Sequence, residues 1–545
     1  MKIVEELCQR YRSLKGSRGN WETHWEEVAE RILPRQIGFV GQRSDGEKKT
    51  QKIFDSKPML ALDRFAAVMD SMLTPRAQRW HNLRTSNEDL NRDHDVQAWF
   101  YQVNNLLYNA RYSPKANFAS QNFERWVSVG AFGTGALYID FDPATGLRYR
   151  CCNLRDLFLL ENHQGVIDTV FRCFKYTARQ AVQAWGEKRM PEKILKALNE
   201  PNRQQELFEF LHVVTPNGDY NPVRADSRGK PYASYYICVE SRTLVADPGG
   251  YNSFPYSISR YVTAPDEVYG RSPAMMALPD IKMLNEMAKT DIRAAHKLID
   301  PPILLHDDGI LGGGATTINM RPGGLNVGGV SRDGRPMIQP FNTGARVDIN
   351  EAKMEQRRMA IDDAFLVTLF QILVETPRMT ATEALIRAQE KGMLLGPTMG
   401  RQQSEALGPL IERELDLLAF HNVLPPMPDI MMEAGGEYEI VYDSPMSRMQ
   451  RAEELVGVQR TMELLAPFAQ IDPSVLDVFN KDELARLTAE VSGVPTPVLR
   501  SPQELRQIRE QRAAQEQEAA MMQAAQPLAG AMKDAAQASA ILQGV

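Results

Sequence analysis

The sequence predicts a predominantly helical α+β fold, and three observations carry this prediction. Apolar residues recur at helical spacing before about residue 110 and again after about residue 270. Between these regions, from Gly130 to about residue 268, β-branched and aromatic runs are typical of strands. Two long helical patterns then flank a block rich in glycine and proline, residues 303–346. With 545 residues, of which 43% are hydrophobic, the chain is long enough for several domains and a large core.

The N-terminal part, to about Arg84, is predicted to be helical. Residues 22–33 carry apolar side chains three or four positions apart, and Pro34 follows them as a helix breaker. A second helix is expected to begin near Ser56, and a third covers residues 95–108.

The strand-like region starts with a predicted hairpin. Asp142 to Gly146 is a turn signal between two strand-like runs. Further strands are expected at residues 206–215, 233–240 and 256–263, with helices between residues 177 and 198. Together with the N-terminal helices, these strands predict an α+β body over residues 1–268.

The two long helical patterns, Tyr269–Pro302 and Val347–Glu375, predict one helix that leaves this body and one that returns. At about 20 residues each they would form rods of roughly 30 Å. We call this pair the stalk. The block between them is interpreted as a small head with glycine turns and candidate strands at 303–305, 315–319 and 336–340. A stalk buries little in a monomer, but copies standing side by side would line a tube.

After Glu375 the chain is predicted to turn and continue mainly as helices. Thr380 to Glu383 is a capping-box pattern that opens a helix, and a further helix is expected from Arg401 to Phe420. A strand is expected at 437–442, and the pattern is helical from residue 445 onwards.

The loop from Glu375 to Met379 has two interpretations. The ordinary one is a plain connection between two helices. The functional one is a loop that projects into a lumen, where Arg378 and Met379 would be the contacting groups.

Composition and motifs exclude several classes of protein. The net charge of −6 does not suggest tight, nonspecific DNA binding, although local basic rings remain compatible with nucleic acid. The five cysteines form no CxxC motif and are expected to be reduced, and no apolar run reaches the ~20 residues that span a bilayer. P-loop, HExxH and GxSxG motifs are absent, so we expect no enzyme, cofactor or metal. His306, Asp307 and Asp308 are interpreted as a solvated acidic turn rather than metal ligands.

Basic residues recur along both predicted stalk helices. For any one of them the ordinary interpretation is a solvated face with ion pairs, such as Glu286 with Lys289. In a ring of copies, each would instead become a belt of positive charge that attracts DNA phosphates without reading bases. The candidates are Lys289, Arg293, Lys297, Lys353, Arg357 and Arg358.

Several long strings, in this order along the chain, resemble the portal (head-to-tail connector) proteins of short-tailed tailed bacteriophages. The strings are GNWETHWEEVAERILP, FDSKPMLALDRFAAVMDSMLTP, VYGRSPAMMALPDIKMLNEM, AAHKLIDPPIL and TPRMTATEALIRAQEKGMLLGP. The resemblance spans most of the chain and weakens after about Ala466.

The resemblance implies an architecture for the chain. Residues 1–270 would be an α+β wing, 271–300 and 347–375 the two stem helices, and 301–346 a small α/β clip. Residues 376–445 would hold the channel loop and the helices that return to the wing. Residues 446–545 would form a helical crown or barrel.

The resemblance also implies a function and partners. Such proteins form a ring, usually a dodecamer, at one capsid vertex, and double-stranded DNA is packaged and ejected through it. The clip would dock the terminase large subunit, which hydrolyses ATP, and then tail adaptor and tail tube proteins; its candidate residues are His306, Asp307, Asp308, Arg332 and Arg335. Major capsid and scaffolding proteins would be further partners, with assembly in the host cytoplasm and a final place in the virion.

Two alternatives remain open from the sequence. One is a head–tail adaptor, or another capsid-associated ring without a DNA-channel role, although adaptors are usually much shorter than this chain. The other is a nucleic-acid enzyme, which the missing P-loop and the lack of clustered acidic residues oppose.

Overall fold

The structure is a computed structural model of the chain. It describes residues 2–41, 46, 49–91, 93–305, 330, 333–336, 338–340, 347–368, 396 and 398–443, and short stretches between 457 and 517. The chain divides into two compact units. Unit 1 comprises Met1–Gln78 and Asn109–His421, and unit 2 comprises Arg79–Tyr108 and Asn422–Val545. The predicted N-terminal region 1–270 is therefore interrupted by residues 79–108, which belong to unit 2.

A six-stranded antiparallel sheet forms one part of unit 1. Its strands run in the order β4-β5-β6-β7-β8, and β9 pairs with β7. Sequential strands are neighbours, so most connections are short. The strands are β4 (Leu157–Glu161), β5 (Ile167–Thr177), β6 (Leu207–Pro216), β7 (Tyr232–Cys238), β8 (Thr243–Leu244) and β9 (Gly249–Tyr251).

Helices cover both faces of this sheet, because alternate residues of each strand point to opposite sides. Helix α1 (Lys2–Ser17) packs with Leu211 of β6 and Ile237 of β7. Helices α7 (Ala178–Trp185) and α8 (Glu192–Asn199) pack with Phe210 and Cys238, the residues adjacent to these two on the same strands. Because side chains alternate along β6 and β7, these strands contribute residues to two separate apolar clusters, one on each face of the sheet.

A second, three-stranded sheet has the order β10-β2-β3. Strands β2 (Thr134–Asp142) and β3 (Gly146–Cys152) form the predicted hairpin, and β10 is Tyr256–Arg260. Gly146 has a φ of 82°, a conformation that glycine adopts without steric cost. Helix α6 (Phe118–Phe132) precedes β2 and is buried along most of its length.

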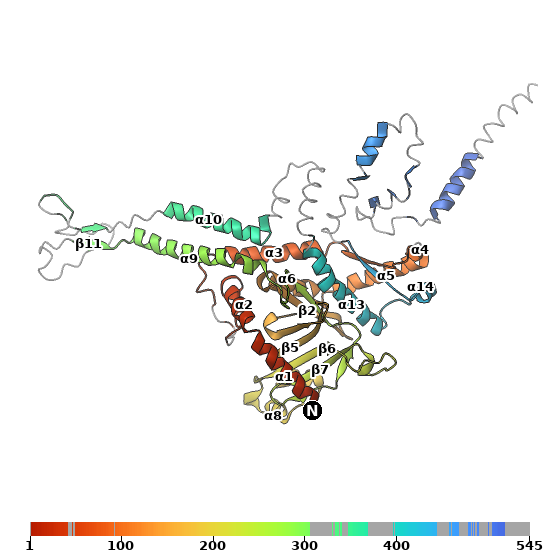
Figure 1. Cartoon of the computed structure of the whole chain (residues 1–545), viewed down its shortest axis with the longest axis horizontal. Helices are drawn as coiled ribbons and strands as arrows, with labels where there is room; N and C mark the ends of the chain where they lie inside the picture. Colours follow the sequence, from red (N-terminus) through yellow and green to blue (C-terminus); the bar gives the residue numbers. More distant parts are fainter. Residues whose placement is uncertain are drawn as a thin grey trace, which may run out of the picture. The chain divides into compact units, whose positions relative to one another are not determined.

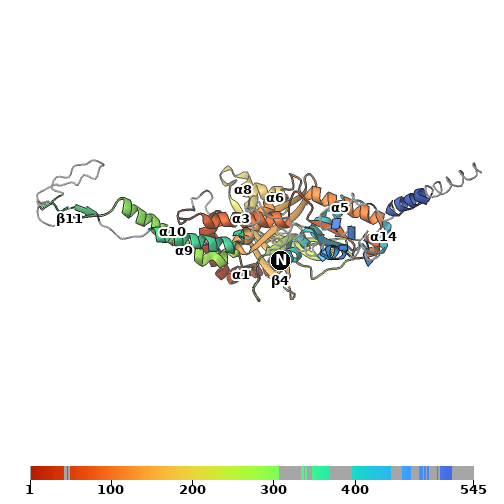
Figure 2. The same ribbon diagram turned by 90° about the horizontal axis from the view of Figure 1, so that it is seen from above.

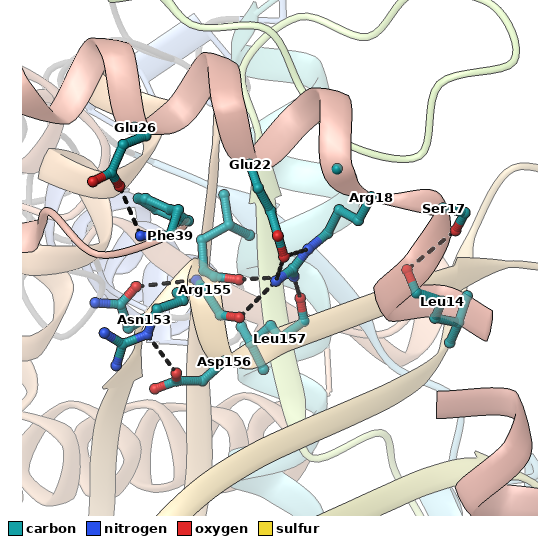
Figure 3. Close-up of polar contacts among 12 residues, drawn as sticks. Leu14, Ser17, Arg18, Glu22, Glu26, Phe39, Asn153, Arg155, Asp156 and Leu157 are labelled. Carbon is teal, nitrogen blue, oxygen red and sulfur yellow. Dashed lines mark hydrogen bonds and ion pairs between the residues drawn. The ribbon is translucent and has the colours of Figure 1, made fainter. Parts of the chain in front are cut away.

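Helix α2 (Gly19–Ile32) is fixed to the six-stranded sheet by a buried arginine at its start (Figure 3). The guanidinium of Arg18 donates hydrogen bonds to the carbonyl oxygens of Arg155, at 2.7 Å, and of Leu154 and Leu157. It also donates to Glu22 at 2.9 Å and lies 3.8 Å from the centroid of the Phe158 ring. The carbonyls belong to the turn η2 (Leu154–Asp156) and the start of β4, so this one side chain joins two elements that are distant in sequence.

The two stalk helices lie side by side and extend away from the sheets of unit 1 (Figures 1 and 2). Helix α9 covers Pro273–Ile299, where the sequence predicts a helix at 271–300. Helix α10 covers Val347–Ala364, and the prediction that this helix continues without a break to residue 375 is wrong. Leu366 has a φ of 60°, which is left-handed and cannot continue a right-handed helix. Residues 369–395 lie outside the described residues.

Part of the predicted head is described. Strands β11 (Ile303–Leu305) and β12 (Ile338–Pro340) pair antiparallel just beyond α9, and Val330 forms a bridge with Pro336. The candidate strand at 315–319 lies outside the described residues.

Unit 2 contains a two-stranded sheet that joins distant parts of the chain. Strand β1 (His81–Arg84) pairs antiparallel with β13 (Glu439–Tyr442). The strand predicted at 437–442 is confirmed. The prediction of helix to about Arg84 is wrong beyond Leu73, where α3 ends and the chain turns into β1. Helices α4 (Glu88–Asn91), α5 (His94–Arg111, whose last three residues belong to unit 1) and α14 (Asp429–Glu433) complete the regular elements assigned between 79 and 443 that involve this unit.

Helix α3 (Lys57–Leu73) matches the helix expected near Ser56. The predicted helix at 401–420 is seen as a turn of π-helix (Gln403–Leu407) followed by α13 (Gly408–Phe420). The capping box at 380–383 lies outside the described residues, as does most of the region 446–545.

Candidate functional site

The stalk leaves the rest of unit 1, which we call the body from here on, at a close crossing of two glycines. Gly133, with a φ of 78°, and Gly270 pass so closely that a Cβ on Gly133 would lie 2.1 Å from the carbonyl oxygen of Gly270. The amide of Gly270 donates to the hydroxyl of Thr134 at 2.9 Å. Any larger residue at this crossing would push the start of α9 away from α6.

The first turn of α9 is capped and packed. The hydroxyl of Ser272 accepts from the amide of Met275 at 2.9 Å, as an N-cap does, and donates to the carbonyl of Ala131 at 2.8 Å. Pro273 occupies the first helical position, where a missing N–H costs nothing. The ring of Tyr269, just before the helix, lies 5.0 Å from that of Trp25. The direction of α9 is therefore set by the body.

Both apolar and polar contacts join the two stalk helices. Ile281 and Leu284 of α9 are buried, as are Met354 and Ile361 of α10. The guanidinium of Arg357 contacts the carboxylate of Asp280 at 2.8 Å. The side-chain amide of Asn350 donates to the carboxylate of Asp291 at 3.2 Å. These two bonds fix the register of α10 on α9 over about two turns of α10 and about three turns of α9.

Residues 52–57, which lead into α3 and include its first residue, cross the root of the stalk, and we call them the strap. The side chain of Asn285 accepts from the amide of Phe54 at 2.8 Å and donates to the carbonyl of Lys52 at 2.9 Å, as a neighbouring strand would. The guanidinium of Arg358 contacts Asp55 at 2.9 Å, and the ammonium of Lys57 contacts Asp362 at 2.5 Å. The strap thus holds α9 through one residue and α10 through two.

A further ion pair ties α9 to α2. The ammonium of Lys282 lies 2.6 Å from the carboxylate of Glu27. The hydrogen bond from Lys282 lowers the pKa of Glu27 below its usual value. This pair adds a second contact between the body and the middle of the stalk helix.

Three of the six predicted DNA-facing basic residues of the stalk are partnered within the chain. Arg357 is paired with Asp280, Arg358 with Asp55 and Glu355, and Lys289 with Glu286 at 3.2 Å. Arg293, Lys297 and Lys353 are exposed and form no ion pair with any residue that the structure describes. Arg378 and Met379 lie outside the described residues.

The outer half of α9 is open to solvent. Ala288 is the last buried residue of the helix, and none of the residues from Lys289 to Ile299, all of them described, is buried. Of the five predicted docking residues in the head, Arg335 is exposed, while His306, Asp307, Asp308 and Arg332 lie outside the described residues.

The described residues hold no cluster of three or more His, Cys, Asp or Glu side chains that could bind a metal ion. The five cysteines are all free. Among the helices that the structure describes, none is both long enough and apolar enough to cross a bilayer.

Sequence reasoning missed the residues that anchor the stalk. Asn285, Asp55 and Glu27 carry no local signal, because each meets its partner more than two hundred residues away. One signal was present: Ser272 before Pro273 is the N-cap and first-turn pattern of a helix start.

Comparisons with known proteins agree with one another. The chain is 30% identical to the "Probable portal protein" of Bordetella phage BPP-1 over 513 residues, which is 93% of this chain and 90% of that protein. It is 28% identical to the "Portal protein" of Salmonella phage epsilon15 over 525 residues, again 93% of this chain and 90% of that protein.

A solved structure described as "Virion of native gene transfer agent (GTA) particle" matches with a TM-score of 0.32 and 13% identity. It covers 82% of this chain and 95% of that chain, and at this score it carries no argument about the present chain.

Residues 4–499 match the family described as "Bacteriophage head to tail connecting protein". Because this match covers most of the chain and a relative at 30% identity aligns over nearly its whole length, the chain belongs to the bacteriophage head-to-tail connecting protein family.

Proposed function

We propose that this chain is the portal protein of a tailed bacteriophage. It forms a ring at one capsid vertex, and double-stranded DNA passes through the ring during packaging and ejection. The relatives' names support this proposal, and the stalk is the observation that carries it. A rod built from two helices, held at its root and exposed to solvent along its outer half, has the form of one element in the wall of a tube.

The dimensions of the stalk suit this role. Helix α9 has 27 residues, which corresponds to a rod of about 40 Å. The strap, the Arg357–Asp280 pair and the glycine crossing hold its root rigidly. A rigid root is what a tube wall needs, because an element that tilts would open or close the lumen.

The charges available to DNA are fewer than the sequence suggests. Lys289, Arg357 and Arg358 are each neutralised by a carboxylate within the chain, so a phosphate would have to compete for them. Arg293, Lys297 and Lys353 are exposed without such partners among the described residues. We propose these three as the stalk's positive belts, and Arg378 and Met379 stay candidates for a channel loop.

A few belts on an acidic protein suit a passive conduit. Affinity for duplex DNA rises with the number of phosphates neutralised, and DNA that must slide has to be bound weakly. The net charge of −6, and the pairing of three of the six candidate basic residues of the stalk, keep that affinity low. ATP hydrolysis then belongs to a separate terminase, and this chain acts without catalysis.

The partners follow from the same proposal. The ring, a dodecamer by resemblance to portals, assembles in the host cytoplasm with scaffolding and major capsid proteins. The head at the end of the stalk, with Arg335 exposed on it, docks the terminase large subunit and later the tail adaptor and tail tube proteins.

Negative-stain imaging of the purified full-length chain tests the central claim. Rings with a central opening are expected. Particles that stay monomeric as the protein concentration is raised would overturn the proposal.

A second experiment separates a portal from an adaptor ring that does not touch DNA. A photo-crosslinking amino acid at position 293 should attach to packaged DNA in virions, while the same group at Glu412, exposed on α13 of the body, should not. Equal crosslinking at both positions, or none at position 293, would remove the assignment of α9 to the channel.

A further inference from the structure

One side of α9 carries an exposed row of methionines. Met276 is 59% exposed and Met283 is 48% exposed, and Met287 is half-buried. The spacing of seven and four residues places all three side chains on one side of the helix. We call these three residues the methionine row.

The opposite side of α9 carries an exposed aromatic ring. Phe54 of the strap is 40% exposed, and its backbone is held against α9 by the bonds to Asn285. The ammonium of Lys289 lies 5.8 Å from the centre of the ring. The strap thus places a large apolar side chain on the surface and fixes its position.

The Phe54 side chain and the methionine row lie at the same height along the stalk. Asn285 is two positions from both Met283 and Met287, which is about 3 Å along the helix axis and about 200° around it. Phe54 and the methionine row therefore face in opposite directions at one height, so the two cannot meet within a single chain.

Burial of the methionine row would not leave a charged side chain buried without a partner. Two charged residues, Asp280 and Glu286, lie three positions from Met283. Both are already paired, Asp280 with Arg357 and Glu286 with Lys289. Burying an unpaired charge is costly, whereas burying apolar side chains is favourable. The row is therefore suited to an apolar partner, and methionine adapts its shape to an aromatic ring at a favourable sulfur–aromatic distance.

A closed ring needs two different, complementary patches on opposite sides of each subunit. When the subunits turn about an axis parallel to the stalk, residues at equal heights on opposite sides meet. The methionine row and Phe54 satisfy both conditions, which favours a second copy of this chain as the partner.

We propose that Phe54 of one copy packs against Met283 and Met287 of the next copy, so that the strap both braces its own stalk and forms the contact to the neighbouring one. This inference rests on the ring proposed above. One face of α9, about 40 Å by 10 Å, offers roughly 400 Å², which is about half of the ~800 Å² per partner in a stable interface. The contact therefore sets the spacing of the stalks, and other surfaces of the ring supply the remaining area.

Cysteine crosslinking of the full-length chain tests the proposal. Phe54→Cys and Met283→Cys are combined, and the assembled rings are treated with a short bis-maleimide. We expect a ladder of covalent oligomers on a denaturing gel, because the two positions face apart within one chain and meet only between copies. The wild type and each single variant control for the five native cysteines.

A matched control uses Phe54→Cys with Met359→Cys. Met359 is 53% exposed on α10 and does not belong to the row, so no ladder is expected above the level of the single variants. Rings in which the Phe54/Met283 pair gives no more ladder than this control overturn the inference and leave the proposed function intact. A wild-type chain that forms no rings overturns the proposed function itself.

A charge placed in the row gives a second readout. Met283→Glu should raise the protein concentration at which half of the chains are in rings by about tenfold or more, because an unpaired carboxylate would be buried. Met359→Glu should leave that concentration unchanged. Equal behaviour of the two variants contradicts the proposed packing of Phe54 on the row.

Discussion

The body and the stalk of unit 1 use arginine in opposite ways. In the body, Arg18 and Arg111 are almost completely buried, and each is surrounded by acceptors. On the stalk, Arg293 is exposed, and it forms no ion pair with any residue that the structure describes. A buried arginine joins elements rigidly because it must keep every partner, whereas an exposed one keeps its charge available to another molecule.

The pair formed by Arg111 and Glu414 shows the first use most clearly. Both side chains have no exposed surface, and the guanidinium contacts both carboxylate oxygens, at 3.0 and 3.1 Å from its Nε. The hydroxyl of Tyr149 donates to the same carboxylate at 2.6 Å. The end of α5, the helix α13 and strand β3 are thereby fixed to one another.

The largest loss of stability is expected from a substitution that disrupts the junction between body and stalk. Gly133→Ala places a Cβ 2.1 Å from the carbonyl of Gly270 and keeps a φ of 78°, so the chain should fold poorly or unfold at a much lower urea concentration. Gly165→Ala is the matched control, because Gly165 has a φ of 77° and open space around it. The control should be destabilised by only about 1–2 kcal/mol, and equal destabilisation of the two variants would show that the crossing does not matter.

Glu414→Ala tests the buried pair in the body. Removing Glu414 takes away the carboxylate that compensates the buried Arg111 charge, and breaking a buried ion pair in this way costs about 3–5 kcal/mol. Urea unfolding followed by tryptophan fluorescence should show a large drop in the midpoint. Glu412→Ala, on an exposed position of the same helix, should change it little. A small effect of Glu414→Ala would mean that the body tolerates the buried Arg111 without this carboxylate.

The pH dependence of stability sharpens the contrast, because the body also buries a neutral histidine. His212 is fully buried against Tyr256, with its Nδ1 at 2.8 Å from that hydroxyl, and burial together with nearby Arg172 lowers its pKa to about 3. Between the ordinary value of 6.5 and about 3, the unfolded chain binds a proton that the folded chain does not. Stability should therefore fall as the pH falls through this window, by up to about 1.4 kcal/mol per pH unit.

Urea midpoints measured between pH 7 and pH 4 check this expectation. His212→Gln should flatten the profile, whereas His163→Gln, at an exposed position, should not. An unchanged slope in His212→Gln would assign the acid sensitivity to other groups.

The smallest expected effect concerns the exposed charges of the stalk. Arg293→Ala with Lys297→Ala should weaken the binding of a short duplex to assembled rings. It should also reduce the steepness of the salt dependence by about 0.9 for each phosphate that is no longer neutralised. Arg357→Ala should leave the salt dependence nearly unchanged, because Asp280 already neutralises that residue. Fluorescence anisotropy of labelled DNA over a salt series measures both, and a larger effect of Arg357→Ala would reverse our assignment.

Much of the local structure could be predicted from sequence, because its signals are local. The hairpin at Asp142 to Gly146 follows from turn residues, and the start of α9 follows from Ser272 and Pro273. The break in α10 could not be predicted: Leu366 sits in an apolar run without glycine, proline or asparagine, yet adopts a left-handed conformation.

The candidate site was less predictable than the fold, since its determinants are long-range contacts. Nothing near Arg358 in the sequence shows that it pairs with Asp55, 303 residues away. The spacing of basic residues along the two stalk helices therefore overestimated the free charge of the stalk. Strand β1 was missed for a similar reason, because four residues without an alternating pattern become a strand only through a distant partner.

The pairing of β1 with β13 also constrains how the chain is made. Arg84 meets Glu439, which lies 355 positions further along the sequence. At the usual 5–20 residues per second, a ribosome needs roughly 20–70 s to cover that distance. During that time β1 has no partner strand, because β13 has not yet been synthesised. This is the interval in which a chaperone could bind β1, or in which two nascent copies could associate prematurely.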